Sequence, residues 1–191
     1  ESFYNPRGTY DGKSHEFIFT HNTLYQGCRD ANRYFCQVTN KFNGEDSKLV
    51  FTDNIIICPD GKVGGKLFSI SAGYWDVTIK NNLIHGWVIP TLAEELGDVS
   101  MENNYSLADL EIPSAAALFA DPANGNFSLY KGVTPVENKS TTGGVLGAQK
   151  WLKDAGQLYN LTHGLAAGVD SLAGTISGPG GKIPEGENVT L

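Results

Sequence analysis

The sequence VTIKNNLI, from Val77 to Ile84, reads as a short alternating strand, an Asn and a second apolar strand. Three other stretches align with it without gaps and keep the Asn in place: FIFTHNTLY (17–25), LVFTDNIII (49–57) and VSMENNYS (99–106). The recurring residues are Asn22, Asn54, Asn82 and Asn104, at spacings of 32, 28 and 22 residues. Such a repeat is typical of coils that cannot bury an apolar face alone and therefore stack on their neighbours.

The recurrence of Asn at one position of every repeat has a physical reason. Asn tolerates the left-handed backbone conformation that a sharp corner between two strands requires, so we expect the four Asn residues to adopt it. Stacked at equal positions in successive coils, their side chains would hydrogen-bond to each other as an asparagine ladder. Alternation along the strands places Ile18, Val50 and Thr78 outside. The inward residues would be Phe17, Phe19, Leu49, Phe51, Val77, Ile79, Val99 and Met101.

Further strand candidates lie between the corners, at residues 34–38 and 66–70, which gives each coil three strands. We therefore predict an all-β fold, a right-handed parallel β-helix. It would be a three-sided solenoid of about four to six coils with a C-terminal extension. An antiparallel sandwich is the alternative, but it does not explain why the Asn recurs at one fixed place inside an apolar run.

We expect three segments along the chain. Residues 1–135 would hold the coils, and residues 136–171 a loop or short-helix segment that caps or links. Residues 172–191 read as two strands around a Gly-Pro-Gly-Gly turn, the start of a small β-domain or a tail strand pair. Both ends begin or stop inside structured-looking sequence, so we expect a piece of a longer protein with N-terminal coils missing.

The composition narrows the class of protein. The chain has 191 residues, with 14 Lys and Arg against 21 Asp and Glu, a net charge of −7. With 40% hydrophobic and 18% charged residues, it is too apolar for intrinsic disorder. No run approaches the roughly 18 apolar residues of a membrane span. The acidic balance argues against a nucleic-acid partner, which would need basic stripes.

The chain has three cysteines, Cys28, Cys36 and Cys58. No Cys-x-x-Cys pair exists, which argues against a zinc site of the usual spacing. Two interpretations stay open: a Cys28–Cys36 disulfide in an oxidising compartment, or three reduced thiols that act as small buried apolar residues.

The Asn-corner repeats resemble the pectate-lyase-like right-handed β-helix proteins. Within that group, the segments FTHNTLYQG, LVFTDNIII, KLFSISAG, VTIKNNLIHG and MENNYSLAD are similar to surface or secreted β-helix proteins of polysaccharide-degrading gut bacteria. The closing DP-x-x-G-x-F segment, residues 121–127, belongs to the same resemblance, which covers about residues 15–130. It implies a carbohydrate partner and a secreted or cell-surface location, on the bacterial outer surface or in the periplasm.

A lyase of this kind needs a cation, often calcium held by carboxylates, and a nearby Lys or Arg as base. The candidate residues preceding the corner Asn residues are His21, Asp53, Asn81 and Glu102. Asp53 and Glu102 would lie two coils apart, about 10 Å, which is too far for one ion, although a hydrolase pair has such a separation. We therefore predict no catalytic residue, no metal site and no cofactor within this chain; calcium is the ion that a lyase site would need.

Glycan binding needs flat aromatic side chains and a few polar groups. Arg33 and Lys66 would pair with uronate carboxylates. The predicted carbohydrate-binding residues are Tyr74, Trp75, Trp87, Arg33 and Lys66; in the alternative interpretation, the two Trp residues cover the coil stack. We predict a monomeric, non-catalytic polysaccharide-binding domain. The alternatives are a polysaccharide lyase or glycoside hydrolase with catalytic coils partly missing, and a structural or adhesion spacer.

Overall fold

The computed structural model describes residues 13–28, 30–38, 46–70, 75–90, 92 and 96–148, and the backbone of 151–152, 177–178 and 181–182. The fold is all-β, and no α-helix occurs in these ranges. The strands are β1 (Glu16–Thr20), β2 (Thr23–Tyr25), β3 (Tyr34–Val38), β4 (Ser47–Thr52), β5 (Ile55–Ile57), β6 (Lys66–Ile70), β7 (Trp75–Lys80), β8 (Leu83–His85), β9 (Val99–Glu102), β10 (Leu129–Tyr130), β11 (Trp151–Leu152), β12 (Ser177–Gly178) and β13 (Gly181–Lys182).

Three short 3₁₀ helices follow β9, namely η1 (Ala108–Leu110), η2 (Ala116–Leu118) and η3 (Pro122–Asn124). Within the described ranges, no helix has the length and apolar character that crossing a membrane requires.

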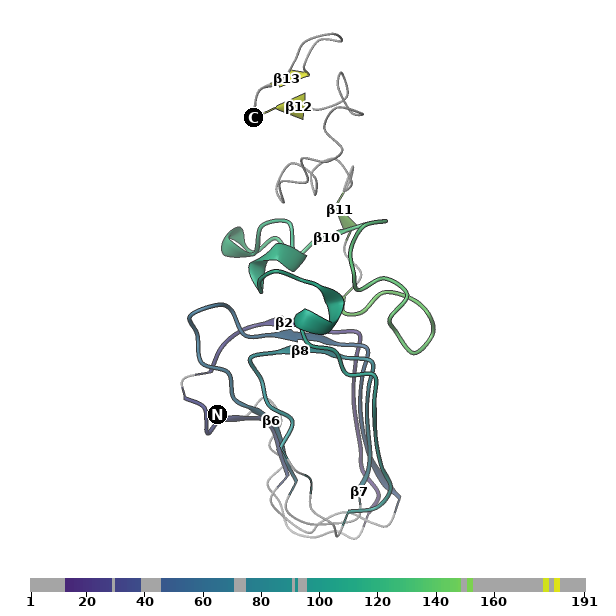
Figure 1. Cartoon of the computed structure of the whole chain (residues 1–191). Helices are drawn as coiled ribbons and strands as arrows, with labels where there is room; N and C mark the ends of the chain where they lie inside the picture. The colour runs from purple at the N-terminus through teal and green to yellow at the C-terminus, as the bar shows by residue number, and fades with distance from the viewer. Residues whose placement is uncertain are drawn as a thin grey trace.

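The coil strands form three parallel sheets, which the chain visits in the same order on each pass (Figure 1). The first sheet has the order β1-β4-β7-β9, the second β2-β5-β8 and the third β3-β6. The register of the first sheet is the one that the gapless repeat predicts, with Phe17, Leu49, Val77 and Val99 side by side. Parallel pairing excludes the antiparallel sandwich for these coils and is compatible with a parallel β-solenoid.

The C-terminal strands were predicted only in part. The strands β12 and β13 pair antiparallel on either side of residues 179–180, as the Gly-Pro-Gly-Gly turn predicts. The strands β10 and β11 pair parallel to each other and were not expected.

The Asn side chains connect the coils through hydrogen bonds. The Oδ1 of Asn82 accepts from both the backbone N–H and the Nδ2 of Asn54, each at 3.0 Å. The Nδ2 of Asn82 donates to Asn104 Oδ1 at 2.8 Å and to Phe51 O at 2.9 Å. The bond from Asn22 to Asn54 repeats the pattern one coil earlier. Every buried amide of the ladder therefore finds its partner in the next coil.

The left-handed corner residue is not the Asn itself, and this part of the sequence prediction is wrong. The residue before each Asn has the positive φ: 54° at His21, 61° at Asp53, 53° at Asn81 and 51° at Asn103. Because the turn is made one residue earlier, each Asn is left to point along the stack and bond to the next coil. The strained position accepts His, Asp and Asn, which tolerate this backbone region best after Gly.

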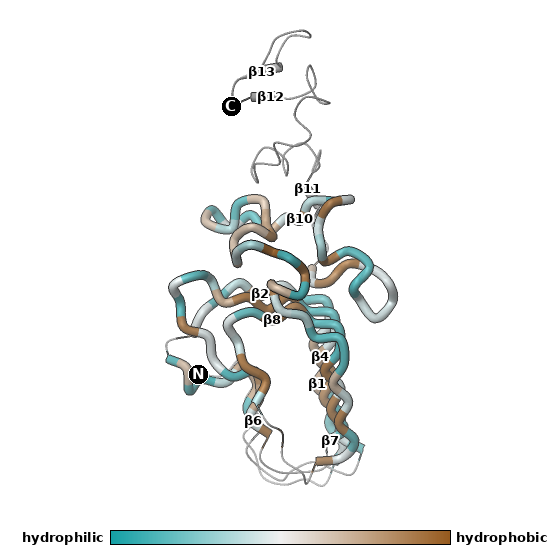
Figure 2. The backbone as a smooth tube through the Cα atoms, viewed as in Figure 1, coloured by the Kyte–Doolittle hydropathy of each residue, from teal (hydrophilic) through white to brown (hydrophobic). Residues whose placement is uncertain are grey.

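Aromatic rings stack inside the coils. The rings of Phe19 and Phe51 lie nearly parallel with centroids 5.3 Å apart, and Phe68 meets Phe51 edge-on at 5.1 Å. Figure 2 shows the apolar residues along the strands of the first sheet; they alternate with polar ones in β7, whereas β1 and β4 each hold three apolar residues in a row. Val99 and Met101 occupy the inward rows, yet they are 42% and 49% exposed, because β9 is the last strand of its sheet.

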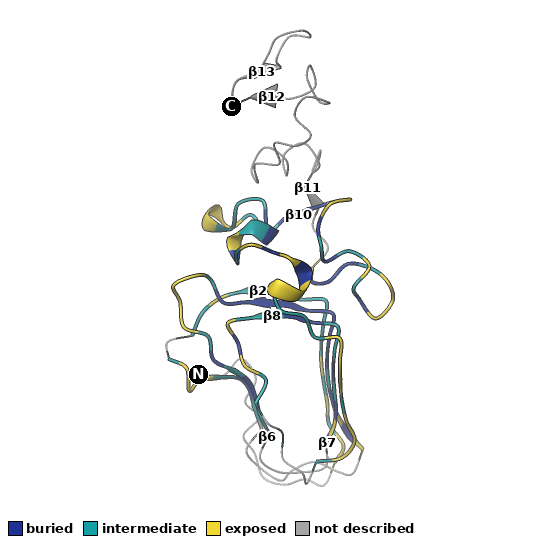
Figure 3. Cartoon of the chain, viewed as in Figure 1, coloured by how far each residue is buried: buried dark blue, intermediate teal, exposed yellow. Residues whose placement is uncertain are grey.

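The second sheet is buried on both faces. Ile56 of β5 packs into the coil interior, whereas Ile55 and Ile57 pack against the segment of residues 107–146. That segment carries the three 3₁₀ helices and lies over β2 and β8, with buried residues at the contact (Figures 1 and 3). The unbroken apolar run Ile55-Ile56-Ile57 is the sequence counterpart of this two-sided burial.

The ladder predicts a position-dependent cost of losing an amide. Asn82→Ala removes the partners of Asn54, Asn104 and the Phe51 carbonyl in a fully buried place, so we expect a loss of about 3 kcal/mol in the free energy of unfolding. Asn22→Ala, at the partly exposed end of the ladder, is the matched control, with an expected loss of about 1 kcal/mol. Urea unfolding measures both, and equal losses would contradict the buried ladder.

Candidate functional site

Residues 107–146 cover the outer face of the second sheet. A ligand of the coils would therefore have to bind at the first or the third sheet. On the first sheet the exposed charges form pairs between strands. Lys80 Nζ lies 3.3 Å from Glu102 Oε1, and the register puts Lys48 between Glu16 and Asp76. The two basic residues, Lys48 and Lys80, thus lie beside three acidic ones, and this face has no surplus of positive charge to select an acidic ligand.

The third sheet gathers cations beside an aromatic ring. Tyr34 of β3 and Lys66 of β6 are register partners, and the Lys66 ammonium lies 5.6 Å from the centre of the Tyr34 ring. The backbone N–H of Lys66 donates to the carbonyl of Arg33 at 2.8 Å, which fixes the two basic residues in adjacent coils. Gly65 permits this approach, since a Cβ there would lie 2.5 Å from the Arg33 oxygen.

The Arg33 side chain is partly exposed to solvent, and Arg33 directly precedes Tyr34 of the Tyr34–Lys66 pair. Its guanidinium is half exposed and makes an ion pair with Asp30, with Nε 3.1 Å from Oδ2. A guanidinium has five N–H donors, so the single bond to Asp30 Oδ2 leaves it the capacity to hold a further carboxylate. Gln37 and Ser69 continue the row of polar partners along the same two strands. We call Arg33, Tyr34 and Lys66 the cationic face.

The predicted Trp residues lie in the core. Trp75 is 1% exposed and Trp87 is 9% exposed, and the Trp87 indole N–H donates to the Gln26 carbonyl at 3.1 Å. In these positions neither indole presents a flat face to a sugar, which agrees with the alternative that the two residues cover the coil stack. Tyr74 lies outside the described residues. Of the five predicted residues, the structure brings together Arg33 and Lys66.

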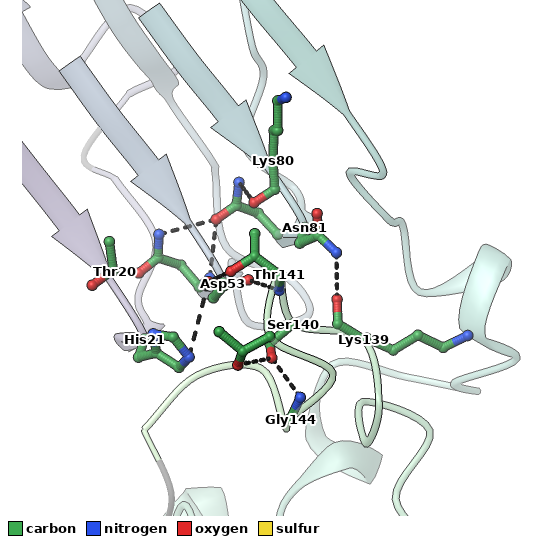
Figure 4. A network of polar contacts seen from close by, with 12 residues as sticks. Thr20, His21, Asp53, Lys80, Asn81, Lys139, Ser140, Thr141 and Gly144 are labelled. Atoms are coloured by element: carbon green, nitrogen blue, oxygen red, sulfur yellow. Dashed lines mark hydrogen bonds and ion pairs between the residues drawn. The ribbon is translucent and has the colours of Figure 1, made fainter. Parts of the chain in front are cut away.

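Sequence reasoning missed Tyr34, and it missed a second cluster at the corners. Asp53 is 2% exposed, and its carboxylate accepts hydrogen bonds from the backbone N–H and the hydroxyl of Thr141, both at 2.6 Å. His21 Nε2 lies 3.9 Å from the same carboxylate, and Asn81 Nδ2 donates to the Lys139 carbonyl at 2.7 Å (Figure 4). The sequence signal that could have indicated this cluster was Asp53, an acidic residue directly before the corner Asn54 inside an apolar run.

This corner cluster fastens the covering segment to the coils. The amide of Gly147 donates to the Asp53 carbonyl at 2.8 Å, and the amide of Ala148 to the Thr23 hydroxyl at 3.0 Å. Both carboxylate oxygens of Asp53 accept hydrogen bonds from Thr141. This arrangement suits attachment of the covering segment to the coils better than proton transfer to a substrate. The cluster is therefore a structural anchor.

The corner assignment of Glu102 is wrong. Glu102 pairs in register with Lys80, and Asn103 occupies the corner position of the fourth repeat. Asp53 is thus the one acidic corner residue among the four, and Glu102 serves the ion pair of the first sheet. Within the described ranges, no three His, Cys, Asp or Glu side chains are placed to hold a metal ion.

All three cysteines are free thiols. Cys36 lies in the coil interior, where burial raises the pKa of its thiol to about 12. Burial and then the neighbouring Asp30 raise the pKa of Cys28. The pKa of Cys58 is raised by burial and next by the Cys28 thiol beside it. The three free thiols agree with the interpretation of reduced cysteines, and the cysteine near Cys28 is Cys58, whereas the disulfide interpretation paired Cys28 with Cys36.

Comparison of the chain with protein-family models, curated proteins and solved structures finds no match. The function therefore has to be argued from the geometry of the site.

The anchor predicts a local effect of Thr141→Val. This change removes a hydroxyl donor to a buried carboxylate, worth about 1.5 kcal/mol, so the amides of Gly144 and Gly147 should exchange with deuterium about tenfold faster. Thr142→Val is the matched control, since that hydroxyl contacts only Ser140 among the described residues. Equal acceleration in both variants would contradict the anchoring role of Thr141.

Proposed function

We propose that the chain is a right-handed, three-sided parallel β-helix whose cationic face binds an acidic polysaccharide without cleaving it. The fold part of the proposal is supported by the constant order in which the chain visits the three sheets. Parallel connections of this kind are right-handed in nearly all proteins. A secreted or cell-surface location belongs to the same proposal.

The observation that carries the binding proposal is the Lys66 ammonium over the Tyr34 ring, with Arg33 one coil away. An aromatic ring offers a flat apolar surface to a sugar, and the two basic groups offer charge-assisted hydrogen bonds to uronate carboxylates. Successive coils lie about 4.8 Å apart, close to the length of one sugar ring, so a chain lying across the coils would meet a new residue with each sugar.

The protein as a whole is acidic, which sharpens the role of the cationic face. With a net charge of −7, the chain repels polyanions except where basic groups are concentrated. The basic groups of the first sheet are matched by Glu and Asp, whereas Arg33 and Lys66 face a single described carboxylate, Asp30. An acidic glycan would therefore be drawn to the third sheet.

Titration calorimetry with oligogalacturonate and with a neutral glucan tests the proposal. We expect millimolar or tighter binding of the acidic glycan, weakened about tenfold by Arg33→Ala and by Lys66→Ala, since each removes one charge-assisted contact of about 1.4 kcal/mol. Lys48→Ala, on the first sheet, is the matched control and should leave the affinity unchanged.

Two results would overturn the proposal. Absence of binding to every acidic and neutral glycan at millimolar concentration would favour the spacer. Release of an unsaturated product that absorbs in the ultraviolet would identify a polysaccharide lyase instead.

A further inference from the structure

Two cysteines from successive coils lie near one another just beyond the end of the second sheet. The amide of Gln26 donates to the Ile57 carbonyl at 2.9 Å, so the segment that leads to Cys28 runs beside the one that leads to Cys58. The loop after Cys58 then folds back, and the Val63 carbonyl accepts from the amide of Cys28 at 2.5 Å. Cys28 is thus held between the strand that precedes Cys58 and the loop that follows it.

The glycines around the two cysteines show how closely the segments pack. A Cβ on Gly27, which directly precedes Cys28, would lie 3.5 Å from the Cys58 Sγ. A Cβ on Gly65 would lie 2.8 Å from the Cys28 Sγ and 3.2 Å from the Trp87 ring. The backbone just before Cys28 therefore lies against the Cys58 thiol, and the Cys28 thiol lies near the Trp87 indole.

We propose that Cys28 and Cys58 are a redox pair, which closes to a disulfide between two successive coils when the chain meets a small-molecule disulfide. Cys28 is partly exposed and Cys58 is buried, so the two thiols have different roles in the reaction. The proposal rests on the packing of these residues and does not depend on glycan binding.

With oxidised glutathione the step balances as two exchanges. The Cys28 thiolate attacks one glutathione sulfur, which forms a mixed disulfide at Cys28 and releases one glutathione thiolate. Cys58 then loses its proton, and its thiolate attacks the Cys28 sulfur. The second glutathione leaves as a thiolate, and the protons released by the two cysteines end on the two glutathione thiolates. Two protein thiols are oxidised, and one glutathione disulfide is reduced.

Cys36 provides an internal control. It lies in the coil interior, and its thiol, with a pKa of about 12, stays protonated at the pH of the experiment.

The test treats the full chain with oxidised glutathione at pH 8.5, then unfolds it, alkylates the remaining thiols and maps the peptides by mass. We expect one alkylated cysteine, Cys36, and a Cys28–Cys58 link that dithiothreitol reverses. The link closes a loop of about 30 residues, so Tm should rise by about 10 °C on oxidation. The variant C36S should show the same link and the same shift, whereas C28S and C58S should show neither.

Three outcomes would overturn the proposal: three alkylatable thiols after oxidation, a link between Cys28 and Cys36, or dimers linked between chains. Should C28S or C58S fail to fold, the peptide map of the unaltered chain and of C36S decides the question alone.

Discussion

Asn54 and Asn82 place whole amide groups in the interior of the coils, where water cannot satisfy them. Leaving a buried amide without a partner would destabilise the fold by more than one hydrogen bond stabilises it. Each amide therefore hydrogen-bonds to the Asn side chain of the neighbouring coil. This requirement sets both the height of a coil and the register between coils. The aromatic stack of Phe19 and Phe51, the contact of Tyr34 with Lys66 and the proximity of Cys28 to Cys58 all depend on that register.

The residue before each ladder Asn makes the left-handed turn, and in two coils its side chain also binds the covering segment. Because the left-handed turn occurs there, its side chain is carried away from the ladder and toward the covering segment. Asp53 uses this position to hold Thr141, and Asn81 uses it to hold the Lys139 carbonyl. One row of the coils thus supplies the internal ladder, and the row beside it supplies the attachment of residues 107–148.

The covering segment packs on the outer face of the second sheet. The charged side chains of the first and third sheets, which it does not cover, are arranged differently. The basic residues of the first sheet lie beside acidic residues of neighbouring strands, as Lys80 does beside Glu102, whereas the third sheet places Lys66 over the Tyr34 ring next to Arg33. Cys28 lies near the same edge, since a Cβ on Gly65 would meet both the Arg33 carbonyl and the Cys28 sulfur. The proposed binding residues and the proposed redox pair therefore lie on one side of the coils.

The sequence by itself determined the strands of the first three sheets, their parallel register and the inward rows, because these follow from a periodic pattern and from hydrogen-bonding needs that recur at fixed spacing. It also proposed Arg33 and Lys66, which the structure brings together. Only the tertiary structure decided that the turn precedes the Asn, that Trp75 and Trp87 are buried, and that Cys58 rather than Cys36 lies near Cys28. Those outcomes depend on contacts between residues with no shared periodicity, such as Trp87 with Gln26 or Asp53 with Thr141, and local pattern carries no information about them.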